Sequence, residues 1–415
     1  MFSIGFHEFG HFFWARKFGM RVPQFFVGFG PTVWSRRRGE TEFGVKAVPL
    51  GGFIRIVGMI PPAEEGESKR ATRMRSFIAE VRGQALNDVL PTDGDRVFYA
   101  KPWWQRVIVM SAGPAHNLVL AVLLFLVLLV GIGIPMASTT VAGVPACVKP
   151  ATTASTTCAA GDVASPAAAA GLRAGDRIVA IDGRTIAQDP NDEGWDALVR
   201  TVQGSAGTPL ALTVERDGAR RQLTVTPIEN KVRTADGDVV TAGYLGIQSA
   251  QVYARQPLSA LPGYFGTIIG QSVQRLGQIP ERVPQLVRAT FAGEKRDPNG
   301  PIGLVGVGRL SGEAFAHDDF TVVEKLSFFV SLLASINMVL FIFNLVPMYP
   351  LDGGHVAGAV YEKLRAVVAR LRGRPDPGPF DIARLMPVAY VVAGVFVVFS
   401  GLLVIADLIN PITLD

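Results

Sequence analysis

The chain has 415 residues, which is too many for one ordinary domain and enough for two or three. Hydrophobic residues make up 49% of the chain, and they are concentrated in long apolar blocks, whereas a soluble core spreads them more evenly. The net charge of +5 is modest. Because many of its Lys and Arg residues stand beside the apolar blocks, we expect no nucleic-acid binding.

The first element, residues 1–18, is predicted to be an apolar helix that carries the sequence His-Glu-Phe-Gly-His at residues 7–11. In a helix His7 and His11 project from one face, one turn apart, so both imidazoles can bind one Zn²⁺ at roughly 2.0–2.1 Å. Glu8 lies one step round the helix and can act as general base toward water at the zinc. The alternative, histidines that merely face lipid or solvent, fits poorly with the cost of polar groups in an apolar helix.

Only six residues precede His7 in this sequence. As a helix, the stretch from Met1 to Ala15 would be about 22 Å long, which falls short of the roughly 20 residues that a spanning helix needs. We therefore expect the first transmembrane helix to be truncated here, through a start site further upstream or a partial helix.

Residues 24–58 contain three strand-like stretches, broken by Gly39 and by Gly51-Gly52, and are predicted to form a β-hairpin or small sheet. An edge at Gly51, Gly52 and Phe53 could hold an unwound substrate segment as an added strand. Residues 59–102 mix charges with few large apolar residues, which indicates a mobile cytoplasmic insertion.

Three apolar blocks, within residues 103–135, 321–350 and 386–409, are each long enough to cross a hydrocarbon core of roughly 30 Å as a helix. One such block could be a buried helix of a soluble protein, but three indicate a membrane protein. Sixteen of the 40 Lys and Arg residues lie between Trp14 and Arg106, and none follows Met386. By the positive-inside rule the basic stretches are cytoplasmic and the C-terminus is outside.

Residues 141–230 are predicted to form a compact domain, followed by a linker or amphipathic segment at 255–320. The run Ala-Gly-Leu-Arg-Ala-Gly-Asp-Arg-Ile at residues 170–178 resembles a PDZ domain, a fold that binds extended peptides at an exposed sheet edge. Its candidate peptide-binding loop comprises Gly171, Leu172, Gly175 and Asp176; the alternative is a PDZ fold that only caps the membrane domain. Cys147 and Cys158 lie in the same extracytoplasmic loop, where a disulfide and two free thiols are equally acceptable.

Two histidines leave a catalytic zinc one ligand short. The candidate third ligand is Asp352, in a Pro- and Gly-rich break directly after the block at 321–350. Broken helices at membrane depth are tolerated mainly where they line a site. The alternative makes Asp352 the cap of a helix within the cytoplasmic segment 351–385.

With this order of motifs, a His-Glu-x-x-His helix, an inserted PDZ-like domain and a late Leu-Asp-Gly, the chain resembles the site-2 protease family of intramembrane metalloproteases. The resemblance implies a multi-pass α-helical membrane protein with a membrane-associated β-hairpin and one inserted extracytoplasmic PDZ domain. It implies that His7, His11 and Asp352 bind Zn²⁺, that Glu8 is the catalytic base, and that Asn344 helps to hold substrate or an oxyanion.

The resemblance also implies regulated intramembrane proteolysis in the cell (inner) membrane, with the active site toward the cytoplasmic side. Expected substrates are single-span membrane proteins, such as anti-sigma factors already cut by an upstream site-1-type protease, and remnant signal peptides. The alternative function is a non-catalytic membrane PDZ receptor or tether of the same fold, but the presence of Glu8 argues against it. A zinc transporter would need acidic and His residues on more helices.

Overall fold

The computed structural model describes residues 1–62, 73–153, 157–234, 239–297 and 300–413. The chain divides into two compact units, which are described separately. Unit 1 comprises Met1–Leu126 and Leu261–Asp415, and unit 2 comprises Val127–Ala260. Both helices and sheets are present, as expected.

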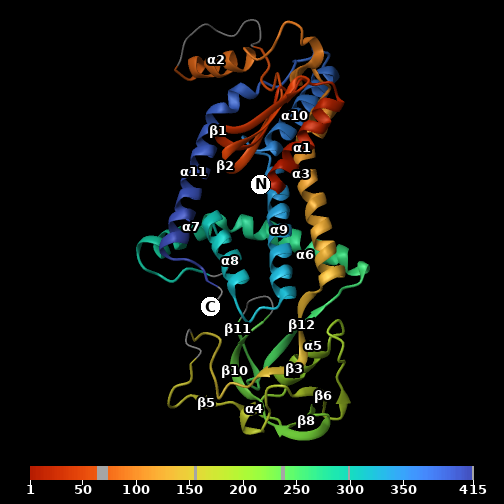
Figure 1. Ribbon diagram of the computed structural model, residues 1–415, viewed down its shortest axis with the longest axis vertical. Coiled ribbons are helices and arrows are strands. Elements are labelled where there is room, and N and C mark those ends of the chain that lie inside the picture. The colour runs from red at the N-terminus through yellow and green to blue at the C-terminus, as the bar shows by residue number, and fades with distance from the viewer. Residues whose placement is uncertain (63–72, 154–156, 235–238, 298–299, 414–415) are drawn as a thin grey trace. The chain divides into compact units, whose positions relative to one another are not determined.

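Unit 1 is mostly helical, and its helices surround the N-terminal helix α1 and one small sheet (Figure 1). Its α-helices are α1 (Phe2–Lys17), α2 (Arg73–Leu86), α3 (Trp103–Leu126), α6 (Leu261–Gly277), α7 (Ile279–Phe291), α8 (Leu304–Ala316), α9 (Val322–Asn344), α10 (Asp352–Leu371) and α11 (Met386–Ile409). Short 3-10 turns lie at η1 (Gly94–Arg96), η2 (Phe98–Ala100) and η5 (Ile382–Leu385). Helix α3 packs against α1, α9 and α10, so it is the central support of the unit.

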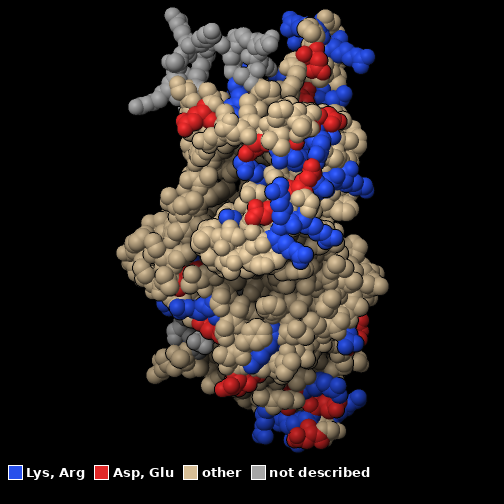
Figure 2. All heavy atoms as spheres, turned by 45° about the horizontal axis from the view of Figure 1, so that its top comes forward, with Lys and Arg blue, Asp and Glu red and all other residues tan. Residues whose placement is uncertain are grey.

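Three helical segments in the described part of the chain are long and apolar enough to cross a membrane: Trp103–Ile132, Val322–Asn344 and Ile382–Ile409. On α11, Val391, Val397 and Val398 are between 67% and 73% exposed, and such an apolar surface is stable only against lipid or another apolar partner. Figure 2 shows many charged side chains gathered at the upper right of the visible face, and beside them an extended area without charges. These features indicate association with a membrane.

The sheet of unit 1 consists of two long strands, β1 (Gln24–Arg38) and β2 (Thr41–Arg55). Residues 42–45 of β2 pair with residues 34–37 of β1 on one side and with residues 24–27 on the other. Residues 24–27 pair in turn with residues 52–55. The two strands therefore form four side-by-side segments, and residues 52–55 are one outer edge, next to α1.

The core of unit 1 fixes the sheet against α1 and α3. Its fully buried members include Ala15 of α1, Val109 of α3, and Met20 and Val22 in the connection to β1. Tight contact between the helices depends on small residues, because a Cβ at Gly10 of α1 would lie 2.5 Å from the carbonyl oxygen of Ala112. The core therefore sets the spacing between α1, the carrier of the histidines, and α3.

Unit 2 is a β-rich domain with two short α-helices, α4 (Pro166–Ala169) and α5 (Gly194–Gln203). Its main sheet has the order β12-β3-β6-β8-β9, and β7 pairs with β6. The strands are β3 (Ile134–Gly143), β4 (Cys147–Val148), β5 (Val163–Ala164), β6 (Arg177–Ile181), β7 (Arg184–Thr185), β8 (Leu210–Arg216), β9 (Ala219–Val225), β10 (Ile228–Arg233), β11 (Val239–Tyr244) and β12 (Gln248–Ala254), flanked by the π-helix η3 (Val127–Ile132) and the 3-10 turn η4 (Leu258–Ala260). The unit extends past the expected 141–230 because β12 pairs with β3 along most of its length.

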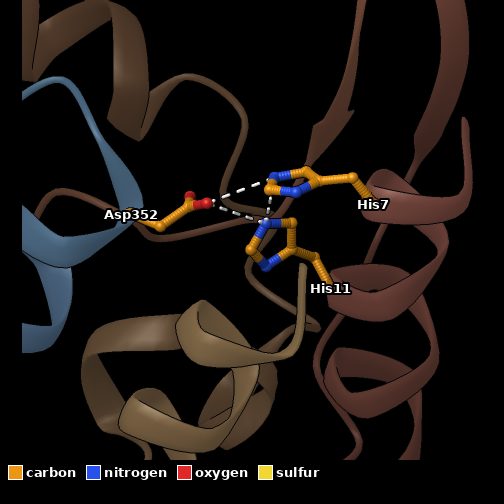
Figure 3. A group of neighbouring side chains, drawn as sticks. All are labelled: His7, His11 and Asp352. Atoms are coloured by element: carbon orange, nitrogen blue, oxygen red, sulfur yellow. Dashed lines mark hydrogen bonds and ion pairs between the residues drawn. The ribbon is translucent and has the colours of Figure 1, made fainter. Parts of the chain in front are cut away.

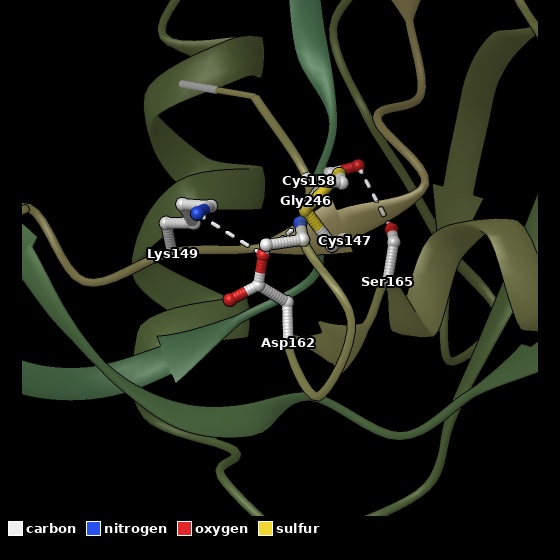
Figure 4. The surroundings of a disulfide bond; sticks show 7 residues. Cys147, Lys149, Cys158, Asp162, Ser165 and Gly246 are labelled. Carbon is white, nitrogen blue, oxygen red and sulfur yellow. Dashed lines mark hydrogen bonds and ion pairs between the residues drawn. A yellow bond between two sulfur atoms is a disulfide. The ribbon is translucent and has the colours of Figure 1, made fainter. Parts of the chain in front are cut away.

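The two cysteines of unit 2 are bonded to each other, with an S–S distance of 1.99 Å. Figure 4 shows the bond beside the ion pair of Lys149 and Asp162, whose charged atoms are 3.0 Å apart. The nearby hydroxyl of Ser165 donates to the backbone oxygen of Gly246 at 3.3 Å. The disulfide thus closes a loop next to Gly246, which lies in the connection 245–247 between β11 and β12.

Part of the predicted cytoplasmic insertion 59–102 lies outside the described residues, at 63–72. The remainder contains α2, η1 and η2. The guanidinium of Arg82 in α2 donates to Asp381 at 2.6 Å; Arg82 is buried and Asp381 is partly buried. Helix α2 of the insertion is therefore held against the rest of unit 1.

Candidate metal centre

Helix α1 presents His7 and His11 on one face, as their spacing of four predicts. Both are buried, with exposed fractions of 9% and 4%. His11 is oriented through its Nδ1, which lies 2.7 Å from the backbone oxygen of Val109 in α3. His7 is oriented through its Nδ1, which lies 3.2 Å from the amide of Asn117. Both rings therefore direct Nε2 into the same space.

Asp352 is the first residue of α10 and reaches the same space from the other end of the sequence (Figure 3). Its Oδ2 lies 3.2 Å from Nε2 of His7 and 3.3 Å from Nε2 of His11. The two Nε2 atoms are 3.1 Å apart. In the described part of the chain, these three residues are the one group of His, Cys, Asp and Glu side chains that could hold a metal ion.

The three atoms fit a zinc ion. Ligands of a tetrahedral zinc at roughly 2.0–2.1 Å stand about 3.3 Å from one another, and the observed separations of 3.1–3.3 Å match that value. Oδ2 of Asp352 is buried, and both imidazole Nε2 atoms face it at 3.2 and 3.3 Å; a buried carboxylate oxygen in such a position is typically paired or coordinates a metal ion. Two imidazoles and one carboxylate also leave a fourth position open, as catalytic zinc requires.

One glycine of α3 makes room for this centre. A Cβ at Gly113 would lie 2.2 Å from Nε2 of His11, a distance that real Cβ atoms essentially never show. The sequence therefore needs glycine at this position in the apolar block, so that α3 can approach the metal ligand directly.

Glu8 faces the free edge of the sheet. Its carboxylate accepts a hydrogen bond from the backbone of Ile54 in β2. A Cβ at Gly52 would lie only 3.2 Å from Cγ of Glu8, so Gly52 lets the edge strand approach this side chain closely. Phe53 turns away from this contact and stacks on Phe26 of β1. The candidate base and the candidate substrate-binding edge are thus adjacent.

The electrostatics of Asp352 favour its ionised form. Burial opposes ionisation of Asp352, but His11 and His7 outweigh it and hold the pKa of this carboxyl well below its usual range. Burial also lowers the pKa of His355, one turn further along α10, to about 4. His355 is therefore neutral near pH 7, and its ring packs edge-on against Tyr349.

The remaining predicted site residues lie elsewhere. Asn344 ends α9 and is half-buried, and its side chain makes no hydrogen bond among the described residues. In unit 2, Leu172 is a core residue. The carboxylate of Asp176 accepts two hydrogen bonds of 2.6 Å from Arg216, and the glycines at 171 and 175 occupy turns with positive φ.

None of the four predicted loop residues lines the groove that unit 2 presents in its described part. This groove, of about 350 Å³, lies between α5 and residues 243–247, and it is lined among others by Trp195, Val199, Val202, Tyr244 and Ile247. The signal for it in the sequence is Tyr-Leu-Gly-Ile at 244–247, a short apolar loop with a glycine. Sequence interpretation also missed the contact of Asn117 with His7, although an Asn within an apolar block is itself a signal of function.

The fold and site define a zinc metallopeptidase associated with a membrane. More specifically, the chain belongs to peptidase family M50, the site-2 protease family: the sequence profile described as "Peptidase family M50" matches residues 1–374. The match spans both histidines, the glutamate and the aspartate. The protein is therefore a zinc metalloprotease, of a family that acts on membrane protein substrates within the bilayer.

Curated relatives carry the same activity in their names. The chain is 34% identical to "Zinc metalloprotease Rip1" of Mycobacterium tuberculosis over 436 residues, which cover 99% of this chain and 96% of the relative. It is 35% identical to the Rip1 protein of Mycolicibacterium smegmatis over 429 residues, with the same coverage. It is also 30% identical to "Metalloprotease MmpA" of Caulobacter vibrioides over 368 residues, which cover 86% of this chain and 82% of that protein.

Proposed function

We propose that this protein cleaves single-span membrane proteins within the bilayer, as in regulated intramembrane proteolysis. The observation that carries the proposal is the position of the metal ligands beside two candidate spanning helices. Asp352 follows α9 after only seven residues, and His11 contacts α3 at Val109 and Gly113. A metal held in this way lies against apolar helices, which supports a reaction with substrates in the membrane.

The reaction uses His7, His11 and Asp352 to hold the zinc and Glu8 to move the proton. When bound, the zinc supplies Lewis-acid chemistry that polarises a carbonyl and makes water nucleophilic near neutral pH. Glu8 takes a proton from the attacking water and returns it to the leaving amine. From the family resemblance, we propose Asn344 as a donor to the substrate or to the developing oxyanion.

We further propose that the substrate adds a strand to the edge formed by residues 52–55. A helical substrate hides its carbonyls in its own hydrogen bonds, so it must unwind before attack, and an exposed sheet edge stabilises the extended form. The contact between Gly52 and Glu8 places this edge beside the base. A Pro at Phe53 should reduce cleavage strongly, whereas a Pro at Ser35, on the opposite edge, should not. Equal effects would argue against strand addition.

We propose that unit 2 is a PDZ domain whose groove between α5 and residues 243–247 takes an extended peptide of the substrate, as a size filter or tail sensor. The apolar lining suits side chains of such a peptide, and Lys231 among the lining residues suits an acidic one. Val199→Asp should abolish peptide binding and leave the zinc content unchanged. Undiminished peptide binding would show that the groove is not the docking site.

The proposed topology places the metal centre toward the cytoplasmic side of the inner membrane and unit 2 outside. The disulfide of unit 2 supports this orientation, because disulfides persist in oxidising compartments. The proposed substrates are anti-sigma factors already cut outside by a site-1-type protease, and remnant signal peptides. Cysteine accessibility on either side of the membrane tests this topology.

The experiment that tests the proposed function measures zinc content and cleavage of a single-span substrate together. Glu8→Gln should retain zinc and lose cleavage, whereas Asp352→Ala should lose both. Undiminished cleavage by the Glu8 variant would show that the protein acts by another route.

A further inference from the structure

We propose that Asn117 is a positioning residue for the metal ligand His7, and that the oxygen of its side-chain amide accepts the hydrogen of His7 Nδ1 when zinc is bound. The proposal rests on one juxtaposition: a fully buried amide of α3 against the outer nitrogen of the imidazole. It deepens the proposed function, because it concerns how the same site holds its metal.

Burying the polar side chain of Asn117 at its position carries a high free-energy cost. It is 0% exposed and lies within the apolar segment Trp103–Ile132, where a buried amide without a partner is strongly unfavourable. Among the described residues, the side-chain amide of Asn117 makes one polar contact, with Nδ1 of His7 at 3.2 Å, and its other amide atom, Oδ1, has no partner there. The position is therefore specified by the imidazole and not by a wider hydrogen-bond network.

The chemistry of the ligand decides which amide atom faces the ring. Nε2 of His7 points at Nε2 of His11 and Oδ2 of Asp352, at 3.1 and 3.2 Å, so the lone pair that binds zinc is on Nε2. A neutral imidazole that binds through Nε2 carries its hydrogen on Nδ1. That N–H needs an acceptor, and a half-turn of the amide group brings Oδ1 to the position 3.2 Å away.

This contact completes the support of the site from α3. The backbone oxygen of Val109, in the same helix, accepts a hydrogen bond from Nδ1 of His11. One helix therefore holds the outer nitrogens of both imidazoles. The two histidines are four residues apart on α1, and their two partners are eight residues apart on α3. Groups that hold the outer nitrogen of a ligand histidine fix its orientation, and their loss typically weakens metal binding by 10–100-fold.

Asn337 of α9 provides a matched control. It is also 0% exposed and lies in an apolar helix, and its Oδ1 also has no partner. However, its Nδ2 donates to the hydroxyl of Ser3 at 2.9 Å and to the backbone oxygen of Leu333, and not to a metal ligand. The Asn337→Ala variant therefore reports what the loss of a buried amide does to the fold alone.

The test measures the zinc dissociation constant of the full-length protein in detergent by competition with a chelator, together with the thermal unfolding of the metal-free form. Asn117→Ala and Asn117→Leu should bind zinc about 10–100-fold more weakly, and Asn337→Ala should bind it as the unchanged protein does. The spectrum of bound Co²⁺ should change in the Asn117 variants and not in the Asn337 variant, because only the former alters the ligand geometry.

Asn117→Asp is the rescue variant, since a carboxylate also accepts the hydrogen of Nδ1, and zinc affinity should return to within a few-fold of the original. Unchanged zinc affinity and Co²⁺ spectrum in Asn117→Leu would overturn the proposal. So would equal losses of zinc affinity in Asn117→Ala and Asn337→Ala. Because zinc binding is measured without substrate, this outcome is distinct from failure of the proposed proteolysis.

Discussion

The close approach of α3 to the metal centre makes Gly113→Ala the sharpest single perturbation of the site. The new Cβ would lie 2.2 Å from Nε2 of His11 and 2.7 Å from two ring carbons. To reach even 3.0 Å, the ring or the helix must move by at least 0.8 Å (3.0 minus 2.2). Zinc–ligand distances in real sites vary by only about 0.2 Å, so a displacement of this size removes His11 from its ligand position.

We expect Gly113→Ala to lose most of its zinc and with it cleavage of a single-span substrate, and to lose about 1–3 kcal/mol of stability from overpacking. The assay is zinc per protein by atomic emission, together with cleavage in detergent. Gly401→Ala is the control, because a Cβ at this α11 position would meet nothing within 4 Å. A Gly113→Ala protein with full zinc and full cleavage would refute the derived site geometry.

Further predictions concern the metal, unit 2 and the packing of α3. A chelator should abolish cleavage, and added Zn²⁺ should restore it in the original protein but not in Glu8→Gln. The pKa of Asp176 is lowered, chiefly by its hydrogen bonds with Arg216. The ionised Asp176 therefore stabilises unit 2 fully above the usual Asp pKa of about 3.9, and this stabilisation is lost as the pH falls further. Hydrogen exchange of unit 2 in the full chain should show the loss. Asp176→Asn should remove this pH dependence of stability. Arg106 in α3 is buried and pairs with the part-buried Glu362 in α10. We expect Glu362→Gln to cost about 3 kcal/mol, the lower end of the range for breaking a buried pair, as measured by thermal unfolding; a cost below about 1 kcal/mol would contradict this.

The three candidate metal ligands could be named from the sequence because the spacing of residues on a helix and the ligand preferences of zinc are both known from local sequence. The spacing of His7 and His11 fixes their common face, and the structure brings their Nε2 atoms to 3.1 Å. Asp352 could be named as the third candidate ligand because a carboxylate in a Pro- and Gly-rich break beside an apolar block favours metal binding. The three candidate spanning segments agree with the expected blocks for a similar reason, since length and hydrophobicity alone define them.

The parts that were not predictable depend on contacts between distant segments. Asn117 and His7 are 110 residues apart, and no spacing rule connects them. The pairing of β12 with β3 joins segments more than 100 residues apart, which is why the extent of unit 2 was underestimated. The candidate peptide-binding loop at residues 171–176 forms a turn held by Arg216, and the groove that lies against residues 243–247 has no short-range signal that connects it to that loop.

The most direct test of the central claim is the position of the scissile bond. A single-span substrate is reconstituted with the protein in liposomes, and its fragments are sequenced by mass spectrometry, with Glu8→Gln as the inactive control. The bond should lie within the apolar span of the substrate and should be cut only by the protein with Glu8 intact. Cleavage confined to the water-exposed flanks, or fragments of the same kind from the Glu8→Gln protein, would contradict it.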